Sequence, residues 1–289
     1  MDISEGMMEG TDAYMDRLVI TSRQNPLIKT VCGLSEKKKR AESGLFRIDG
    51  IKLVREAADT GMEMRYVICT EYMSGVAEEL ATGASADTLV TVSEPVFEKL
   101  SEQSAPEGIM AVCVMPESLH SSHSAEECAE LLRDGERILI AESLRDPGNL
   151  GTVMRSCFAL GIDRLVLTSD CADIYNPKTQ RAAMGAIFRL PTLTVTDSLP
   201  EFIERLKEKG RRVFATALHT EAVVIGDIKL CAGDCFVIGN EGHGLTEQTI
   251  QACTSAAIIP MTEGAESLNA AAAATICIWE TVRAQGEKL

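Results

Sequence analysis

The sequence lacks the features of several common protein classes. Its 289 residues include one tryptophan, and aromatic residues make up only 4% of the chain. It has no run of 18 apolar residues, so we expect no membrane-spanning helix. Residues 1–16 are acidic and rich in methionine, without the basic-then-apolar order of a secretory signal, and we interpret them as a flexible tail. The net charge of −15 argues against a protein that simply coats nucleic acid.

Cysteine is present but has no motif spacing. The ten cysteines are scattered, and no two of them form a Cys-x-x-Cys pair. Cys113, Cys157 and Cys277 lie in apolar runs, where cysteine behaves as a small buried hydrophobe. We therefore expect reduced thiols in a cytoplasmic protein. His120 and His123, near Cys128, form an incomplete ligand set for structural zinc in a Ser-rich polar stretch, so we expect no metal.

Positive charge is concentrated in one stretch, residues 17–56. It carries ten Lys or Arg and four acidic residues, whereas the rest of the chain is strongly acidic. A charge run is usually a solvated face, but a local basic segment in an acidic chain indicates contact with a polyanion. The candidate contacts in this stretch are Arg23, Lys29, Lys37, Lys38, Lys39, Arg40 and Arg47.

The order of apolar and polar segments predicts two α/β domains joined by a linker. Strand-like and helix-like segments alternate over residues 17–115, with one helix expected over 31–41. Residues 116–136 break this periodicity and are rich in Ser, His and Glu, which indicates a linker with a short helix at 126–132. The second domain, 137–289, opens on a continuous apolar run typical of a buried parallel strand.

Three turns of the second domain share one design: a buried strand, a polar turn with Gly or Asn, and a helix. The strands are expected at 137–141, 236–239 and 257–259. In open parallel sheets the carboxyl ends of the strands meet at one edge, where ligands bind. Helix capping alone would explain one such turn, but three together indicate a built site. The polar side chains that this places together are Asn149, Arg155, Asn240, Glu241, Ser267 and Asn269.

These turns carry a family resemblance. Residues 146–155 (Asp-Pro-Gly-Asn-Leu-Gly, then Arg155), 238–245 (Ile-Gly-Asn-Glu-Gly-His-Gly-Leu) and 259–269 (Ile-Pro-Met, then Ser-Leu-Asn) resemble the three signature motifs of the SpoU-type (TrmH-type) RNA 2′-O-ribose methyltransferases of the SPOUT superfamily. Residues 137–285 resemble the catalytic domain, and 17–115 resemble the L30e-like substrate-binding domain of that family. Residues 175–178 and 181–186 are similar to the sub-group related to thiostrepton-resistance methylases.

The resemblance implies a C-terminal SPOUT parallel-sheet domain with a deep trefoil knot, preceded by the small L30e-like domain. It also implies a homodimer that binds RNA rather than DNA, and S-adenosyl-L-methionine as methyl donor. Lys178 and Arg181 join the basic stretch as candidate RNA contacts. The residues that would hold the cofactor are Thr216, Ala217, Gly239, Asn240, Gly242, Ile259, Met261 and Leu268.

The family motifs also suggest catalytic roles. A ribose 2′-hydroxyl is a poor nucleophile at neutral pH, so its proton must be taken or its developing charge stabilised. Arg155 is the candidate; because arginine is normally always protonated, we favour phosphate binding and alkoxide stabilisation, with a base role left open. Asn149 and Glu241 would orient Arg155 and the ribose, while Ser267 and Asn269 would fix the loop and the substrate.

Three functions were weighed. The leading one is methylation of a ribose 2′-hydroxyl, in ribosomal RNA on the two-domain layout or alternatively in transfer RNA. The second is a non-catalytic RNA-binding or ribosome-associated protein that keeps the fold, which the complete set of motif residues argues against. The third is a dinucleotide-dependent dehydrogenase, but the first strand of the second domain lacks the Gly-x-Gly-x-x-Gly fingerprint. The sequence names neither the RNA position nor the choice between ribosome maturation and antibiotic resistance.

Overall fold

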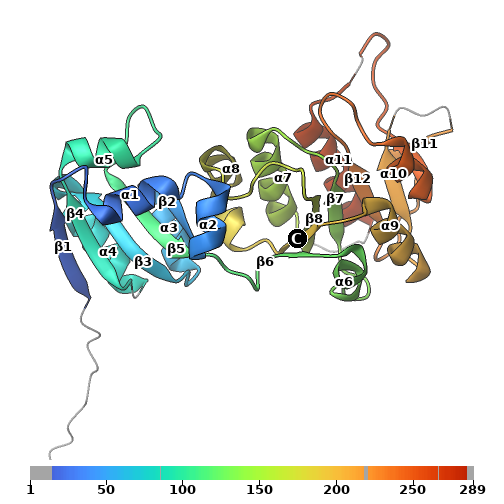
Figure 1. The fold of residues 1–289 in the computed structure, drawn as a ribbon. Coiled ribbons are helices and arrows are strands. Elements are labelled where there is room, and N and C mark those ends of the chain that lie inside the picture. The colour runs from blue at the N-terminus through green and yellow to red at the C-terminus, as the bar shows by residue number, and fades with distance from the viewer. Residues whose placement is uncertain (1–14, 85, 218–220, 266, 285–289) are drawn as a thin grey trace, which may run out of the picture. The chain divides into compact units, whose positions relative to one another are not determined.

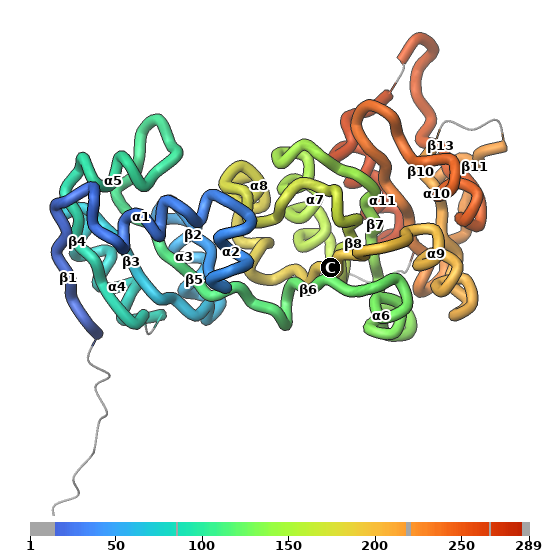
Figure 2. Tube along the Cα trace, viewed as in Figure 1, coloured from blue at the N-terminus to red at the C-terminus, as the bar shows by residue number. Residues whose placement is uncertain are grey.

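The computed structural model describes residues 15–84, 86–217, 221–265 and 267–284, which form two compact units. The first unit is Met1–Leu34 with Arg47–Val114, and the second is Ser35–Phe46 with Met115–Leu289. Figures 1 and 2 trace the elements of each unit in chain order. Among the described helices, none combines the length and the apolar character that a membrane span requires. The domain boundaries drawn from the sequence stay predictions.

The first unit is built on a five-stranded sheet in the order β1-β4-β3-β5-β2. β4 pairs in parallel with β1 and β3, and β5 runs antiparallel to β3. Helices pack on this sheet through one apolar face each, as α3 does with Leu53, Val54 and Ala57. The strands are β1 (Asp16–Ile20), β2 (Leu45–Asp49), β3 (Met64–Thr70), β4 (Thr88–Val92) and β5 (Ile109–Val114). The helices are α1 (Pro26–Gly33), α3 (Ile51–Asp59), η1 (Glu71–Met73), α4 (Ser74–Gly83) and α5 (Glu94–Leu100).

The single helix predicted over 31–41 is wrong, because two helices cover this region. α1 ends at Gly33, a residue with low helix propensity, and α2 occupies Lys37–Ser43. Glu36 between them is extended, with φ −89° and ψ 127°. The three lysines therefore lie in the first turn of a helix, not in the last.

The second unit contains an eight-stranded sheet in the order β11-β13-β10-β12-β7-β8-β9-β6. Every neighbouring pair in it is parallel, which confirms the predicted parallel-sheet α/β architecture. The threading of the expected knot stays a prediction. The strands are β6 (His120–His123), β7 (Ile138–Ala141), β8 (Arg164–Thr168), β9 (Thr192–Val195), β10 (Val213–Thr216), β11 (Val223–Val224), β12 (Cys235–Ile238) and β13 (Ser255–Ile258).

Helices cover both faces of this sheet (Figure 1). Ile138 and Ile140 of β7 share one core with Phe202 and Ile203 of α9, while the intervening Leu139 is buried toward the opposite face. α6 and α10 pack beside α9, and α7 packs between α8 and α11. The helices are α6 (Ala125–Glu130), α7 (Pro147–Ala159), α8 (Pro177–Ala183), η2 (Met184–Phe188), α9 (Leu199–Glu208), η3 (Ile225–Asp227), α10 (Glu247–Ala252) and α11 (Ala270–Ala284).

The stretch 116–136, predicted to be a linker, contributes regular structure to the second unit. The short helix expected at 126–132 is confirmed as α6. β6 was not predicted, because its sequence His-Ser-Ser-His lacks an apolar alternation; it pairs with β9 at the sheet edge. A ring nitrogen of His120 makes a 2.8 Å hydrogen bond with the Ile187 carbonyl.

The cysteines behave as the sequence predicts. All ten are free thiols and lie in the described part of the chain. Cys113, Cys157 and Cys277 are completely buried. Burial raises the pKa of these thiols, and that of Cys113 to about 12. Protonated, inaccessible thiols of this kind act as packing groups.

Candidate active site

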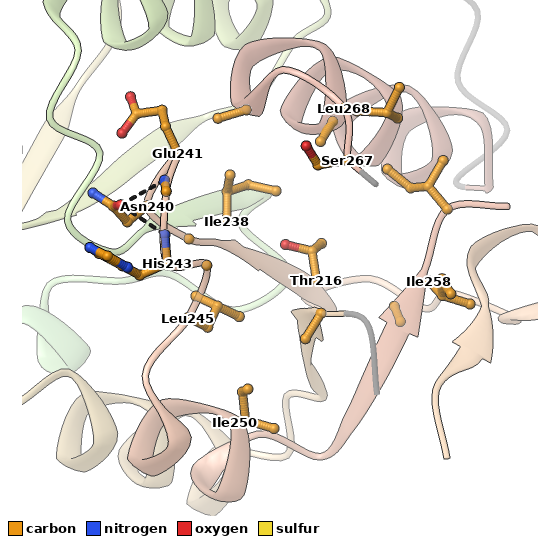
Figure 3. A pocket seen from close by; sticks show the side chains of 18 of the residues that line it. Thr216, Ile238, Asn240, Glu241, His243, Leu245, Ile250, Ile258, Ser267 and Leu268 are labelled. Atoms are coloured by element: carbon orange, nitrogen blue, oxygen red, sulfur yellow. Dashed lines mark hydrogen bonds between the residues drawn. The ribbon is translucent and has the colours of Figure 1, made fainter. Parts of the chain in front are cut away.

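The three predicted turns lie at one edge of the second unit's sheet. The parallel register aligns the ends of neighbouring strands, pairing Ile238 of β12 with Ala141 of β7 and Thr216 of β10 with Ala257 of β13. The chain that leaves the ends of β10, β12 and β13 encloses a pocket of about 530 Å³, a size typical of small-molecule sites. Figure 3 shows Thr216 near the middle of the pocket wall, with the β12 turn on one side and Ser267 and Leu268 on another.

The pocket contains every residue predicted to hold a cofactor. The sequence reasoning named eight, and all eight line this cavity: Thr216, Ala217, Gly239, Asn240, Gly242, Ile259, Met261 and Leu268. It missed the apolar wall formed by Ile238, Leu245, Ile250, Ala270 and Ala273. The signal for these was available, since each lies within a few residues of a predicted turn.

Close backbone packing shapes the β12 turn. A Cβ atom on Gly239 would lie 2.3 Å from the carbonyl carbon of Gly244 and 2.6 Å from its oxygen. Asn240 and Gly244 exchange backbone hydrogen bonds of 3.0 Å each way, which closes the turn at that point. Only glycine fits at position 239, because any side chain would push the two strands of this turn apart.

Three of the five predicted catalytic residues form one hydrogen-bonded chain. The Asn269 amide donates to the Asn149 carbonyl oxygen at 3.0 Å, and the Asn149 amide donates to Glu241 Oε1 at 3.0 Å. Each residue comes from a different signature turn. Asn269 Oδ1 also accepts hydrogen bonds from the backbone N–H groups of Ala271 and Ala272, so this residue caps the N-terminus of α11. Asn269 therefore acts as a helix cap and as a member of the hydrogen-bonded chain at the same time.

Glu241 joins its own turn to the one before α7. Its carboxylate accepts from the backbone N–H of Asp146 at 3.0 Å and of Arg145 at 3.3 Å. Partial burial raises the pKa of Glu241, but the hydrogen bonds from Asn149 and from backbone N–H groups outweigh it and hold the pKa below the ordinary glutamate value. Glu241 is therefore ionised at neutral pH and already engaged with three donors.

Arg155 and Ser267 are not part of this chain. Arg155 is exposed on α7, six residues after Asn149, which at ~100° per residue directs it to a different side of the helix. Within the described residues, the Arg155 guanidinium makes no hydrogen bond or ion pair, so the expectation that Asn149 and Glu241 orient it directly is not met. Ser267 is exposed and lines the pocket, with no hydrogen bond from its hydroxyl to another described residue.

α8 packs closely against α7 beside the site. A Cβ on Gly151 would lie 2.4 Å from the Thr179 carbonyl oxygen, so this glycine permits the contact. Lys178 Nζ lies 3.6 Å from Asp146 Oδ2, and Arg181 is exposed. The hydrogen bond from the Asn149 N–H, helped by Lys178, lowers the pKa of Asp146, the residue that caps α7.

The basic residues of 17–56 divide into two groups. Lys29 and the three lysines of α2 are exposed, although Glu42 lies within 3.1 Å of Lys39 and 3.9 Å of Lys38. Arg23 is also exposed and donates to the Pro95 carbonyl at 2.7 Å.

Arg40 and Arg47 need a correction. Arg40 is only 2% exposed and pairs with Asp173; Arg47 is 7% exposed and pairs with Glu102 and the Leu100 carbonyl. Both guanidinium groups are buried and are engaged by acceptors of the protein itself. The predicted RNA contact is therefore wrong for these two residues in this structure, because a charge run in sequence does not reveal which members turn inward.

Comparisons with known proteins agree with this geometry. The family model described as the SpoU rRNA methylase family matches residues 136–279, and the MRM3-like substrate binding domain matches residues 25–111. The chain is 32% identical over 260 residues to the 23S rRNA (guanosine(2553)-2′-O)-methyltransferase RlmP of Bacillus subtilis, with 90% of this chain and 97% of that protein covered.

Solved structures give the same result. The crystal structure of an RNA 2′-O ribose methyltransferase is 30% identical, with a TM-score of 0.74 and coverage of 93% of this chain and 99% of that one. The AdoMet-bound rRNA methyltransferase from Sinorhizobium meliloti is 26% identical, with a TM-score of 0.79 and coverage of 94% and 99%. This chain, whose three signature turns are joined by one chain of hydrogen bonds, belongs to the SpoU rRNA methylase family.

Proposed function

We propose that this protein transfers a methyl group from S-adenosyl-L-methionine to a ribose 2′-hydroxyl of ribosomal RNA. The observation that carries the proposal is the hydrogen-bonded chain from Asn269 through Asn149 to Glu241 beside the pocket. It unites the three family turns, and the chain's relatives are named as rRNA 2′-O-methyltransferases. An rRNA substrate also accords with the cytoplasmic location expected from the sequence.

The pocket suits S-adenosylmethionine. Leu245, Ile250 and Ile258 offer an apolar wall for a flat base, and the turn 239–244 exposes backbone polar groups to a ligand's ribose and amino-acid ends. When bound, the cofactor supplies an electrophilic methyl group on a sulfonium. The protein's part is to hold donor and ribose in line, since positioning of two reactants contributes several kcal/mol to catalysis, roughly 7–11 in the best cases.

The state of the charged groups argues for electrostatic stabilisation of the hydroxyl. Glu241 has a lowered pKa and accepts three hydrogen bonds, so it is a poor proton acceptor and acts as a positioning group. Arg155 is a permanent cation on the exposed surface of α7. In this proposal Arg155 binds an RNA phosphate and stabilises the alkoxide as it forms, while Ser267 and Asn269 fix the third turn.

The substrate contacts are proposed from exposure and charge. The exposed cations proposed as contacts in this acidic chain are Arg23 and Lys29 in the first unit and, in the second unit, the α2 lysines together with Lys178 and Arg181 of α8. Phosphates dominate the affinity of protein–RNA contacts, so a few such cations suffice to place an RNA whose exposed nucleotides are then recognised by shape.

A homodimer completes the proposal. Phe158 of α7 is 45% exposed and Trp279 of α11 is 48% exposed, and these two helices pack together with a 2.9 Å contact between the Ser156 and Thr275 hydroxyls. Large exposed aromatic side chains on adjoining helices favour a self-association surface. Sedimentation velocity of the wild type and of W279D tests this, because a charge at the interface would shift the protein to monomers.

The reaction is tested by transfer of a labelled methyl group to unmodified ribosomal RNA and, separately, to unmodified transfer RNA, followed by nucleoside analysis. We expect a 2′-O-methylnucleoside in ribosomal RNA. The same product in transfer RNA alone would replace the substrate, and label on a base would overturn the ribose assignment. Tight RNA binding with no transfer to either RNA would favour a binding protein that keeps the fold.

A further inference from the structure

A second carboxylate, Glu142, lies directly after β7 and was not predicted to belong to the site. Glu142 is only 6% exposed. Within the described residues no Lys, Arg or His forms an ion pair with it. Burying a carboxylate without a cationic partner is costly unless hydrogen bonds satisfy it. The groups that donate hydrogen bonds to Glu142 therefore indicate which part of the structure it holds in place.

The donors of Glu142 come from the far end of the β12 turn. The Thr246 backbone N–H donates to Oε2 at 2.9 Å, the Thr246 hydroxyl to Oε1 at 2.9 Å, and the Thr249 hydroxyl to Oε1 at 2.7 Å. Thr246 is the N-cap of α10, and Thr249 is completely buried. Glu142 therefore fixes the point where the pocket-lining turn ends and α10 begins, more than a hundred residues later in the chain.

The two turns hold each other in both directions. Glu142, after β7, accepts donors at the end of the β12 turn, whereas Glu241, within the β12 turn, accepts backbone donors of the turn after β7. The Asn240 amide adds a 2.8 Å hydrogen bond to the Ser143 carbonyl. The segment between these anchors, residues 239–245, lines the pocket.

We infer that Glu142 is a positioning residue for the cofactor, an inference that rests on the proposed function. β12 fixes one end of the segment 239–245, and Glu142 fixes the other. Without its acceptor the Thr246 end is free to move, and Leu245 and Ile250, which border that end, leave their places in the pocket wall. A ligand then has to order the segment on binding, which lowers its affinity.

The same strand offers a matched control. Glu136, just before β7, is 5% exposed and accepts from the Arg133 backbone N–H at 2.8 Å and from Arg164 Nε at 2.9 Å. It is as buried as Glu142 but lies at the opposite end of β7, and it does not line the pocket. Its loss should lower stability without changing the cofactor site.

The experiment measures the Kd of S-adenosylhomocysteine and S-adenosylmethionine by isothermal titration calorimetry, and the Tm, for the wild type, E142A, E142Q, T249V and E136Q. We expect E142A to raise both Kd values about tenfold, on the order of one buried hydrogen bond. E142Q should be milder, because its amide oxygen can accept from Thr246 while its NH₂ group donates to the hydroxyls. T249V removes one donor without changing shape and should raise Kd about threefold, on the same scale.

E136Q should lower the Tm but keep Kd within about twofold of the wild type, since its hydrogen bonds are remote from the turn. When the cofactor concentration is varied, the E142 variants should show a raised cofactor KM, with little change in kcat for RNA methylation at saturating cofactor. If E142A does not fold, E142Q and T249V carry the test.

The results separate this inference from the proposed function. If the wild type binds and E142A and T249V bind with the same Kd, the role of Glu142 is overturned and the proposed function stands. The same conclusion follows if E136Q loses as much cofactor affinity as E142A. A wild type that binds neither ligand would overturn the proposed function and this inference with it.

Discussion

The hydrogen bond between Asn149 and Glu241 can be converted into a repulsion by a single isosteric change. In N149D the Oδ1 atom still accepts from Asn269, as in the wild type. The second carboxylate oxygen replaces the amide nitrogen that now lies 3.0 Å from Glu241 Oε1. Two ionised carboxylates then face each other where one donor and one acceptor stood.

The size of the effect follows from this distance and from solvent. Two like charges ~4 Å apart repel by ~1 kcal/mol in water and by ~4 kcal/mol at an effective dielectric constant of about 20. The pair is partly solvated, so the lower part of this range applies, and the lost hydrogen bond adds ~1 kcal/mol. A total of ~2–4 kcal/mol, expressed in the transition state, corresponds to a roughly 30- to 800-fold loss of kcat/KM.

The effect should depend on pH with a definite sign. In the wild type the pKa of Glu241 lies below the ordinary glutamate value, so the carboxylate stays ionised down to acidic pH. In N149D the mutual repulsion raises the upper pKa of the pair above that value. Lowering the pH from about 8 to about 5.5 adds a shared proton and restores an O–H···O hydrogen bond, so the ratio of mutant to wild-type kcat/KM should rise.

The assay is methyl transfer to ribosomal RNA at both pH values, with N25D as a control. Asn25 caps α1 in the other unit by accepting from Leu27 N at 2.8 Å, a role that aspartate fills equally well. N25D therefore makes the same charge change away from the Asn149–Glu241 pair, and its activity relative to the wild type should not rise on acidification. Wild-type activity of N149D at pH 8, or a mutant to wild-type ratio that falls on acidification, would refute the coupling of these turns to catalysis.

Three further predictions concern different parts of the protein. R155A should abolish methyl transfer while the Kd for S-adenosylmethionine, measured by calorimetry, stays within about twofold, because Arg155 lies outside the pocket wall; unchanged turnover would remove it from the mechanism. G239A should weaken cofactor binding more than tenfold, since its Cβ would meet the Gly244 backbone at 2.3 Å, whereas G226A, whose Cβ would meet nothing within 4 Å and which lies outside the pocket lining, should bind normally. The triple variant K37A/K38A/K39A should raise KM for RNA and reduce the salt dependence of RNA binding by up to about two units of slope; an unchanged slope would exclude α2 from the RNA contact.

Local patterns predicted the architecture, and the family resemblance supplied the candidate cofactor residues. The apolar runs at β7 and β12 identify buried parallel strands, and the rule that parallel strand ends share an edge brings distant turns together. The eight residues that the family resemblance assigns to the cofactor all lie at the end of a strand or in the segment after it, and all of them line the pocket. No side-chain geometry was needed for that step.

Side-chain direction was the part that local patterns could not supply. α7 begins at Pro147 because Asp146 caps it, so Asn149 and Arg155 lie within one helix but on different sides of it. The reciprocal anchors are also invisible in sequence: Glu142 and Thr246 are 104 residues apart, and only the folded sheet brings them into contact. A polar edge strand such as β6 could not be predicted either, because its sequence shows no alternation of apolar and polar residues.

The charge distribution limits how this protein can bind RNA. The net charge is −15, and two of the arginines in the basic stretch are buried against acceptors of the protein itself. The cations left for phosphates are a small exposed set on α1, α2 and α8 and in the segment before α1. Each phosphate contact contributes about 0.7–0.9 to the salt slope, so the total slope should be modest. Affinity must then come largely from shape and exposed nucleotides, which selects a folded RNA site over RNA in general.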